Sequence, residues 1–315
     1  MLVEPLLHGH KPPVPLCHAA LALSHLLSCS GLIIIRLAMN EAPENYDSVN
    51  FIFWRFVGAT PLLLVAVAAT SGLPRLSWSE ARTFLALGAG IVCNQLFVNL
   101  GVQLAGALLA TCMQPSSAIL AAALAVAVGQ ERPSIRVAVG LCLAVSGAVT
   151  IAAGRSKGGG PSGDSGALLL GMLCLVVHAA GWAGYIVGVK AVVSRYSSLA
   201  ITGAAQAAGL AIMAGLVGLR QGCVPDAPGV ALPRATLLPL LYWVVVVSGL
   251  CYVLTAWASR QLPASTVTLY ATLQPGAGAA LAVLLLGERL RWTDLGAVGV
   301  VAGLVVVARR PREDV

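Results

Sequence analysis

The feature that most constrains this chain is a succession of apolar runs, each long enough to cross a membrane as a helix. About 20 apolar residues span the hydrocarbon core of a bilayer, and only helices and closed barrels satisfy their backbone hydrogen bonds in lipid. We expect ten such runs to form helices, over residues 16–38, 51–71, 83–104, 107–128, 135–153, 166–189, 198–219, 237–258, 264–286 and 292–309. The predicted fold class is therefore an all-α integral membrane protein with ten transmembrane helices.

The composition argues against a soluble protein and against a nucleic-acid binder. Charged residues make up only 10% of the chain and hydrophobic residues 58%, whereas a soluble domain carries about 25% charge. The net charge is +7, but the basic residues stand singly at the ends of the apolar runs, apart from Arg309, Arg310 and Arg312. A nucleic-acid binder gathers its basic residues on one face or element, so we expect no nucleic-acid partner.

The cysteines give no sign of a metal or a cofactor. The chain has eight cysteines, nearly all inside apolar runs, and no two of them are spaced as C-x-x-C. A structural zinc site needs clustered ligands, so we expect neither a metal nor a cofactor. The first apolar stretch, residues 14–39, is too long for the core of a cleavable signal peptide, and we interpret it as a retained first helix.

Short motifs recur at a nearly constant spacing along the chain. His18-Ala19-Ala20 recurs as His178-Ala179-Ala180, and Gln114-Pro115 recurs as Gln274-Pro275, each 160 residues later. A Gly- and Ser-rich stretch typical of a flexible linker lies at the midpoint. We predict a first five-helix repeat, a linker and a second five-helix repeat, over residues 1–153, 154–165 and 166–315.

An odd number of helices in each repeat places the two repeats in opposite orientations across the membrane. Inverted repeats of this kind form a substrate site near the midplane. If the N-terminus lies inside, the inner side holds eleven basic residues and the outer side eight. That difference follows the positive-inside tendency and predicts that both termini are cytoplasmic.

Two stretches also resemble a known repeat. Residues 118–154, with Gly129-Gln130-Glu131-Arg132, and residues 275–309, with Gly287-Glu288-Arg289, resemble the EamA-type repeat of the drug/metabolite transporter superfamily. The first stretch departs from the pattern in having Ala118 where a proline is usual. The resemblance implies ten helices and the transport of amino acids, auxin-like acids or other metabolites. The motifs most similar to the plant and algal Walls-Are-Thin (nodulin-21-like) branch are Trp54-Arg55-Phe56, Asn94-Gln95 and Gln114-Pro115-Ser116-Ser117.

Charged side chains are missing from the centres of the expected helices. Intramembrane ionisable residues are costly and usually functional, and no Asp, Glu, Lys or Arg lies mid-helix in this prediction. The lack of a carboxylate disfavours organic cations as cargo, and the lack of a cation disfavours nucleotide sugars or sugar phosphates. A neutral, zwitterionic or weakly acidic solute remains. We interpret the Glu-Arg pairs after the fourth and ninth runs as structural.

Buried amides are the first candidates for binding a solute. Gln114 and Gln274 each precede a proline, which removes a backbone donor and frees a carbonyl. Asn94, Gln95 and Asn99 form a polar group in the third helix, where residues four apart share a face. These amides either line a cavity or make interhelical hydrogen bonds, which are worth only about 0.6 kcal/mol each.

Arginine, aromatic and histidine side chains complete the candidates. Arg55 lies four or five residues inside the second helix, where it either snorkels to the interface or captures a solute carboxylate at the outer mouth. The aromatic candidates for cavity walls are Trp182, Tyr185 and Tyr270. Several of the aromatic residues would serve equally well as interfacial anchors. The candidates for proton coupling are His18, His25 and His178, since histidine titrates near neutral pH; the alternative is a neutral, hydrogen-bonded role.

The sequence therefore predicts a transporter of a small organic metabolite that works by alternating access. The rival is a membrane-embedded receptor or scaffold without flux. An enzyme is not expected, because no carboxylate pair, metal cluster or activated nucleophile lies within the runs. The expected partners are the small-molecule substrate and the lipid bilayer, with a homodimer compatible with the sequence, and the expected location is the plasma membrane rather than an internal membrane.

Overall fold

A computed structural model provides the structure of the chain. The structure describes residues 13–41, 47–70, 77–105, 110, 113–114, 116–135, 138–140, 142–143, 146–147, 150, 165–223, 230–274, 276–277, 292, 302 and 306. Within these residues every regular element is a helix, and six helices are long and apolar enough to cross a membrane. The all-α membrane class predicted from the sequence is confirmed.

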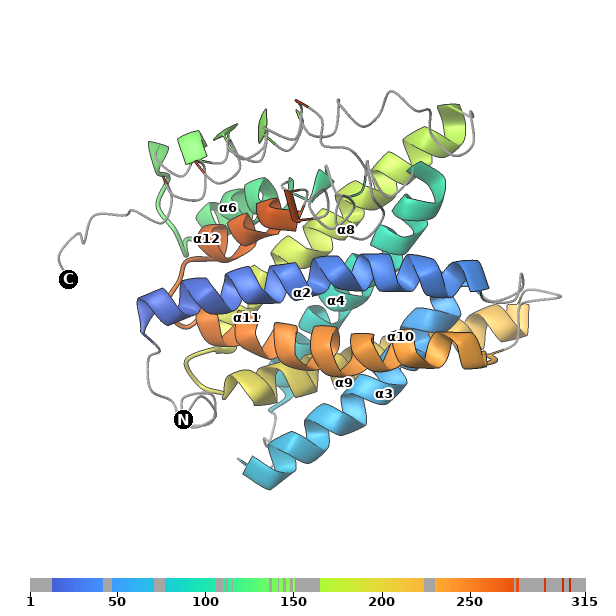
Figure 1. The fold of residues 1–315 in the computed structure, drawn as a ribbon. Coiled ribbons are helices and arrows are strands. Elements are labelled where there is room, and N and C mark those ends of the chain that lie inside the picture. Colours follow the sequence, from blue (N-terminus) through green and yellow to red (C-terminus); the bar gives the residue numbers. More distant parts are fainter. Residues whose placement is uncertain are drawn as a thin grey trace. The chain divides into compact units, whose positions relative to one another are not determined.

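The helix boundaries follow the predicted runs closely (Figure 1). The long helices are α2 (Val14–Glu41), α3 (Ser48–Thr70), α4 (Trp78–Ala105), α8 (Ser165–Val192) and α9 (Ser198–Cys223). A composite sixth span consists of η2 (Arg234–Thr236), α10 (Leu237–Tyr242), η3 (Trp243–Cys251) and α11 (Tyr252–Ala258). The shorter elements are α6 (Ser116–Ala127), α12 (Ala264–Leu269) and η4 (Tyr270–Thr272). The predicted fifth and tenth helices, and the linker 154–165, lie largely outside the described residues.

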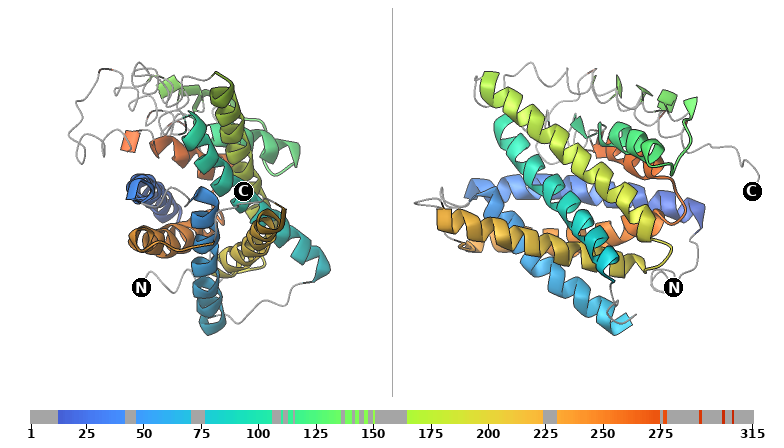
Figure 2. Two further views of the ribbon diagram at one scale, coloured as in Figure 1. Left: turned by 90° about the vertical axis from the view of Figure 1, so that its right-hand side faces the viewer. Right: turned by 180° about the vertical axis from the view of Figure 1, so that it is seen from behind.

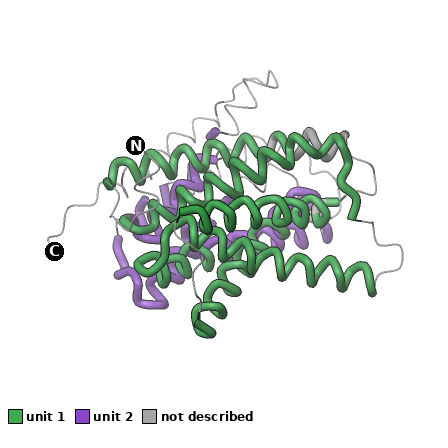
Figure 3. Tube along the Cα trace, turned by 90° about the horizontal axis from the view of Figure 1, so that it is seen from below, with its two compact units in different colours: residues 1–96, 184–261 green, residues 97–183, 262–315 purple. Residues whose placement is uncertain are grey.

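The chain divides into two compact units (Figure 3). Unit 1 comprises residues 1–96 and 184–261, and unit 2 comprises residues 97–183 and 262–315. Each unit therefore takes segments from both halves of the sequence. Helices α4 and α8, the long teal and yellow-green helices of Figure 2, each contribute residues to both units.

In unit 1, α3 and α9 pack antiparallel along their length. At one end of the pair Asp47 and Arg220 form an ion pair with a 2.6 Å N–O distance. Near the middle Thr60 Oγ1 donates to the carbonyl of Gln206 over 3.2 Å. From the first contact to the second, residue numbers rise along α3 and fall along α9, so the two helices run in opposite directions. These helices are the second members of the two sequence repeats, so antiparallel packing is the arrangement that an inverted duplication requires.

Helix α2 lies alongside the composite span in unit 1, blue beside orange in Figure 1. Tyr242 donates its hydroxyl proton to the Leu27 carbonyl over 3.0 Å, and Trp243 Nε1 donates to the Gly31 carbonyl over 3.0 Å. A Cβ atom at Gly31 would lie 3.2 Å from the Trp243 ring. Residue 31 therefore has to be small to allow the indole its position.

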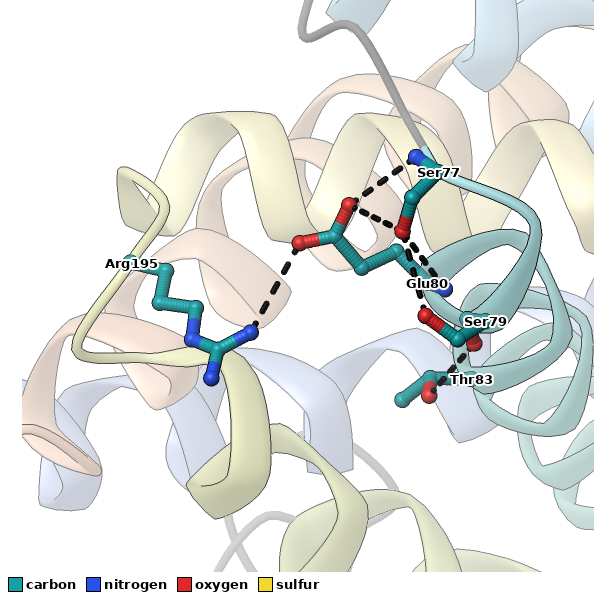
Figure 4. A network of polar contacts seen from close by, with 5 residues as sticks. All are labelled: Ser77, Ser79, Glu80, Thr83 and Arg195. Atoms are coloured by element: carbon teal, nitrogen blue, oxygen red, sulfur yellow. Dashed lines mark hydrogen bonds and ion pairs between the residues drawn. The ribbon is translucent and has the colours of Figure 1, made fainter.

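The start of α4 in unit 1 shows a capping box (Figure 4). The Glu80 carboxylate accepts from the Ser77 backbone N–H over 2.9 Å, while the Ser77 hydroxyl accepts from the Glu80 N–H over 3.4 Å. This reciprocal pattern satisfies donors at a helix start, and it explains why α4 begins at Trp78 rather than at the predicted residue 83. Arg195 lies 3.8 Å from Glu80 but is 71% exposed, so this ion pair adds little. A hydrogen bond to the Glu80 carboxylate raises the pKa of Tyr196.

In unit 2, α6 packs against α12, and Glu131 fixes the start of α12. Its carboxylate accepts from the Ser265 backbone N–H over 3.1 Å and from the Ser265 hydroxyl over 2.6 Å. The structural role that the sequence indicated for Glu131 is thus confirmed. The bond joins the residue after the fourth predicted helix to the first turn of the ninth.

Replacing Glu131 with alanine should lower the thermal unfolding midpoint of the purified protein. The change leaves the Ser265 N–H and hydroxyl without their acceptor, which costs about 1–3 kcal/mol for a buried donor. Glu131→Gln keeps one acceptor oxygen, so its unfolding midpoint should lie between those of the parent protein and Glu131→Ala. The control is Arg132→Gln at the exposed neighbouring position, and an equal midpoint for Glu131→Ala and the parent protein would contradict the assigned role.

Candidate substrate-binding site

Arg55 is a buried cation within the membrane-spanning part of unit 1. Its side chain is only 3% exposed, and it is the eighth residue of α3, just after the first two turns. The snorkelling interpretation is therefore wrong. The reason is local: the composite span opposite α3 supplies polar and aromatic partners that the sequence pattern did not reveal.

Hydrogen bonds to Ser248, Gln95 and Tyr252, together with two aromatic rings, hold the Arg55 guanidinium. Nε donates to the Ser248 hydroxyl over 2.5 Å, and Nη1 donates to Gln95 Oε1 over 2.5 Å. The guanidinium carbon lies 4.5 Å from the centroid of the Trp243 ring and 6.0 Å from that of Tyr252. A cation over an aromatic face is stabilised by the ring quadrupole, by about 2 kcal/mol or more when the pair is desolvated.

The remaining end of the guanidinium is unused. Nη2 is buried and has no hydrogen-bond partner among the residues that the structure describes. Among the described residues, the carboxylates of Asp47 and Glu80 pair with Arg220 and Arg195 and not with Arg55. Arginine keeps its proton and carries five N–H donors in a planar fork. The site therefore presents a positive charge whose described partners are all neutral, with one pair of N–H groups available for an acceptor.

The π-helical segment η3 brings the partners of Arg55 together. In a π-helix the backbone hydrogen bonds join residues five apart, and such turns occur frequently at functional sites. Trp243 and Ser248 are five residues apart, and Tyr252 follows four residues later, at the start of α11. All three therefore face α3 on successive turns. In a regular α-helix of the same sequence Ser248 and Tyr252 would still share a face, but Trp243 would point to a different side.

A second layer of hydrogen bonds fixes the amide of Gln95. Its Nε2 donates to the Tyr252 hydroxyl over 2.7 Å and to Asn94 Oδ1 over 2.8 Å. Both amide protons are thus used away from Arg55, and Oε1 is turned toward the guanidinium. The Tyr185 ring packs edge-on against Tyr252, with 5.6 Å between centroids. Unit 1 therefore brings together four of the predicted site residues: Arg55, Asn94, Gln95 and Tyr185.

The other candidates lie elsewhere, most of them in unit 2. His178 and Gln114 are both buried, and His178 Nε2 lies 3.2 Å from Gln114 Oε1. Gln114 thus makes the interhelical contact that was one of its two interpretations. The remaining candidates of unit 2 are the buried Gln274 and Tyr270 and the partly buried Asn99 and Trp182. In α2 of unit 1, His25 is buried and His18 is partly exposed.

Sequence reasoning missed three buried polar or aromatic residues of unit 1. Trp243 and Ser248 belong to the Arg55 site, and Gln206 is a buried amide on α9 whose Nε2 has no hydrogen-bond partner among the described residues. A signal for Ser248 was present, because Ser248-Gly249 interrupts a run of valines. Small polar residues within an apolar helix often mark a local irregularity.

Comparison with known families also finds a domain that occurs twice in the chain. The sequence profile of the EamA-like transporter family matches residues 21–153 and matches again over residues 169–309. The chain belongs to the EamA-like transporter family. The EamA domain is therefore present twice in this EamA-like transporter, as the internal repeats predicted, and the protein is a multi-pass integral membrane transporter. The match is to the family as a whole, and the Walls-Are-Thin branch stays a prediction.

Two individual similarities agree with this membership. A protein of Archaeoglobus fulgidus described as an "Uncharacterized transporter" is 27% identical over 305 residues, which cover 94% of this chain and 98% of the relative. A solved structure described only as "Crystal structure of protein" matches with a TM-score of 0.73 and 16% identity, covering 92% of this chain and 96% of that one. At that identity the second similarity establishes the fold alone.

Proposed function

We propose that this EamA-like transporter carries a small organic carboxylate by alternating access, and that Arg55 binds the carboxylate group. The observation that carries the proposal is the buried Arg55 guanidinium, whose Nη2 end has no acceptor within the described part of the chain. Guanidinium and carboxylate match as a planar, bidentate pair. A carboxylate oxygen on Nη2 would complete the donor fork, with its second oxygen on Nη1 beside Gln95.

The partners of Arg55 favour an anion over a zwitterion or a cation. Gln95, Ser248 and Tyr252 are neutral, and no described carboxylate lies on the guanidinium to receive a cargo ammonium group. A cationic cargo would be repelled at short range in a low-dielectric site. Of the neutral, zwitterionic and weakly acidic solutes that the sequence left open, the acid fits best. Trp243 and Tyr252 supply apolar walls for its body.

The remaining candidates keep secondary roles in this proposal. The amides Gln114 and Gln274 of unit 2 remain candidates for binding the solute, and proton coupling through His18, His25 and His178 is the alternative to facilitated transport. We place the protein in the plasma membrane. The competing function is a receptor or scaffold without flux, and membership of a transporter family favours transport over it.

Two matched sets of compounds test the charge of the cargo. Vesicles containing the purified protein would be incubated with indole-3-acetate, tryptophan or tryptamine, which share an indole ring and differ in charge. A second set is 3-phenylpropionate, phenylalanine and phenethylamine. We expect protein-dependent uptake to be fastest for the acid of each set and slowest for the amine, after subtracting leak into protein-free vesicles. Preference for the amine, or no flux for either set, would contradict the proposal.

A further inference from the structure

We infer that the protein is an exchanger, in which Arg55 must hold an anion on the return stroke as well as on the forward stroke. This inference rests on the proposed function, because it takes Arg55 as the group that binds the carried carboxylate. It adds a second cargo, namely an anion that travels in the opposite direction.

The first step of the argument is the permanent charge of Arg55. A guanidinium keeps its proton at physiological pH, and the side chain is only 3% exposed. Its described contacts are Ser248, Gln95, Trp243 and Tyr252, none of which carries a negative charge in its usual protonation state. Taking an ion out of water is costly, and neutral dipoles repay only part of that cost.

The second step concerns what a bound carboxylate does to that charge. A carboxylate on Nη1 and Nη2 neutralises the guanidinium and provides the acceptor that Nη2 lacks. The occupied site is then a hydrogen-bonded ion pair with no net charge. The unoccupied site keeps its full positive charge. Excluding water from the unoccupied site therefore costs more free energy than excluding water from the occupied site.

The third step applies this difference to transport. Alternating access takes the binding site through a form that is closed to water on both sides. The neutral, loaded site passes through that form more readily than the charged, empty site. Reorientation of the empty carrier is therefore the slow step of net transport, and an anion bound on the far side removes it.

A coupling cation cannot replace the returning anion. A proton or a sodium ion bound beside Arg55 would add to the positive charge of the site instead of neutralising it. A co-transported cation could therefore balance the charge of the cargo on the forward stroke, but it would not help the empty site to return. The charge of Arg55 thus favours exchange over cation-coupled accumulation.

Exchange predicts strong stimulation of uptake by an internal anion. Uptake of radiolabelled indole-3-acetate would be measured in vesicles loaded with unlabelled indole-3-acetate, with chloride, with tryptamine, or with a potassium HEPES buffer alone. Potassium and valinomycin hold the membrane potential at zero, so that charge accumulation does not limit net uptake. We expect internal indole-3-acetate to raise the initial rate at least about tenfold over buffer, equivalent to about 1.4 kcal/mol in the barrier.

The other loading conditions and two variants test whether the stimulation of uptake by an internal anion depends on Arg55. Stimulation by chloride would support the inference with chloride as the returning anion, whereas stimulation by tryptamine would overturn it. Arg55→Gln removes the charge, and Gln95→Glu supplies a fixed carboxylate beside it. Both should transport slowly, with a rate ratio near one between loaded and unloaded vesicles. Arg220→Gln, which breaks only the ion pair with Asp47, should keep the ratio of the parent protein.

The outcomes separate this inference from the proposed function. Equal uptake by the parent protein in vesicles loaded with indole-3-acetate, with chloride and with the potassium HEPES buffer alone would overturn exchange and leave carboxylate transport standing. No uptake under any loading condition would overturn the proposed function, and the inference with it. The parent protein alone decides between these results, so the test does not depend on the stability of a variant.

Discussion

Replacing Arg55 with glutamine is expected to reduce carboxylate uptake about 30- to 4,000-fold. Removing one member of a buried, hydrogen-bonded charge pair costs about 2–5 kcal/mol, and each 1.4 kcal/mol corresponds to a factor of ten. Glutamine retains a donor but loses the charge and the bidentate fork that the carboxylate would occupy. The measurement is the initial rate of indole-3-acetate uptake per folded molecule in vesicles.

Two further variants separate the charge of Arg55 from its shape and from general damage. Arg55→Lys keeps the charge but loses the Nε bond to Ser248 and the planar fork, so its uptake should fall between that of the parent and that of Arg55→Gln. Arg220→Gln removes a cation of α9 that pairs with Asp47 and should change uptake less than threefold, because a partly exposed ion pair contributes about 0–1 kcal/mol. Normal uptake by Arg55→Gln would remove Arg55 from the binding site.

The positions of the long helices could be predicted because hydropathy alone determines them. An apolar run of about 20 residues has no alternative to spanning the membrane, and α2, α3, α8 and α9 begin and end within about four residues of the predicted limits. The start of α4 was predicted five residues late. The Ser77-x-x-Glu80 capping box marks the correct start in the sequence.

The binding site was predictable only in part. Asn94 and Gln95 stand out because neighbouring amides are unusual in an apolar run, and the structure places Gln95 on Arg55. The direction of Arg55 could not be derived, because a residue near a helix end can point either way and the partners on the composite span, such as Ser248, are almost 200 positions distant. The π-helical turn of η3 has no reliable sequence signature, so the approach of Trp243 and Ser248 to Arg55 remained hidden.

The sequence also could not predict which of the candidate residues lie in contact with one another. The repeats align Gln114 with Gln274 and His18 with His178, which suggested symmetric pairs. The structure instead joins Gln114 to His178, which belong to different positions of the two repeats. Repeat symmetry relates positions to one another, but it does not determine which side chains come into contact.

Replacing Gly88 with a larger residue is expected to lower the folding stability of the protein strongly. Gly88 lies where α4 crosses α9 in unit 1, and a Cβ atom there would lie 2.6 Å from the backbone nitrogen of Gly209 and 2.7 Å from Cβ of Ala208. Backbone atoms cannot move aside as a flexible side chain can. Gly209 in turn packs against the ring of Phe56, the neighbour of Arg55 on α3. Three helices therefore depend on this close approach.

Gly88→Ala should destabilise the protein by about 1–3 kcal/mol, the usual cost of overpacking, and Gly88→Leu should leave little folded protein. The matched control is Gly215→Ala on α9, where an added Cβ meets no atom of the described residues within 4 Å. There the gain in helix propensity, about 0.5–1 kcal/mol, should leave stability equal or slightly higher. Thermal unfolding midpoints and the monodisperse fraction on size-exclusion chromatography measure both changes. Because Gly88 acts through packing, Gly88→Ala should retain most of its uptake per folded molecule, and equal midpoints for Gly88→Ala and Gly215→Ala would show that α4 and α9 do not approach as closely as this geometry requires.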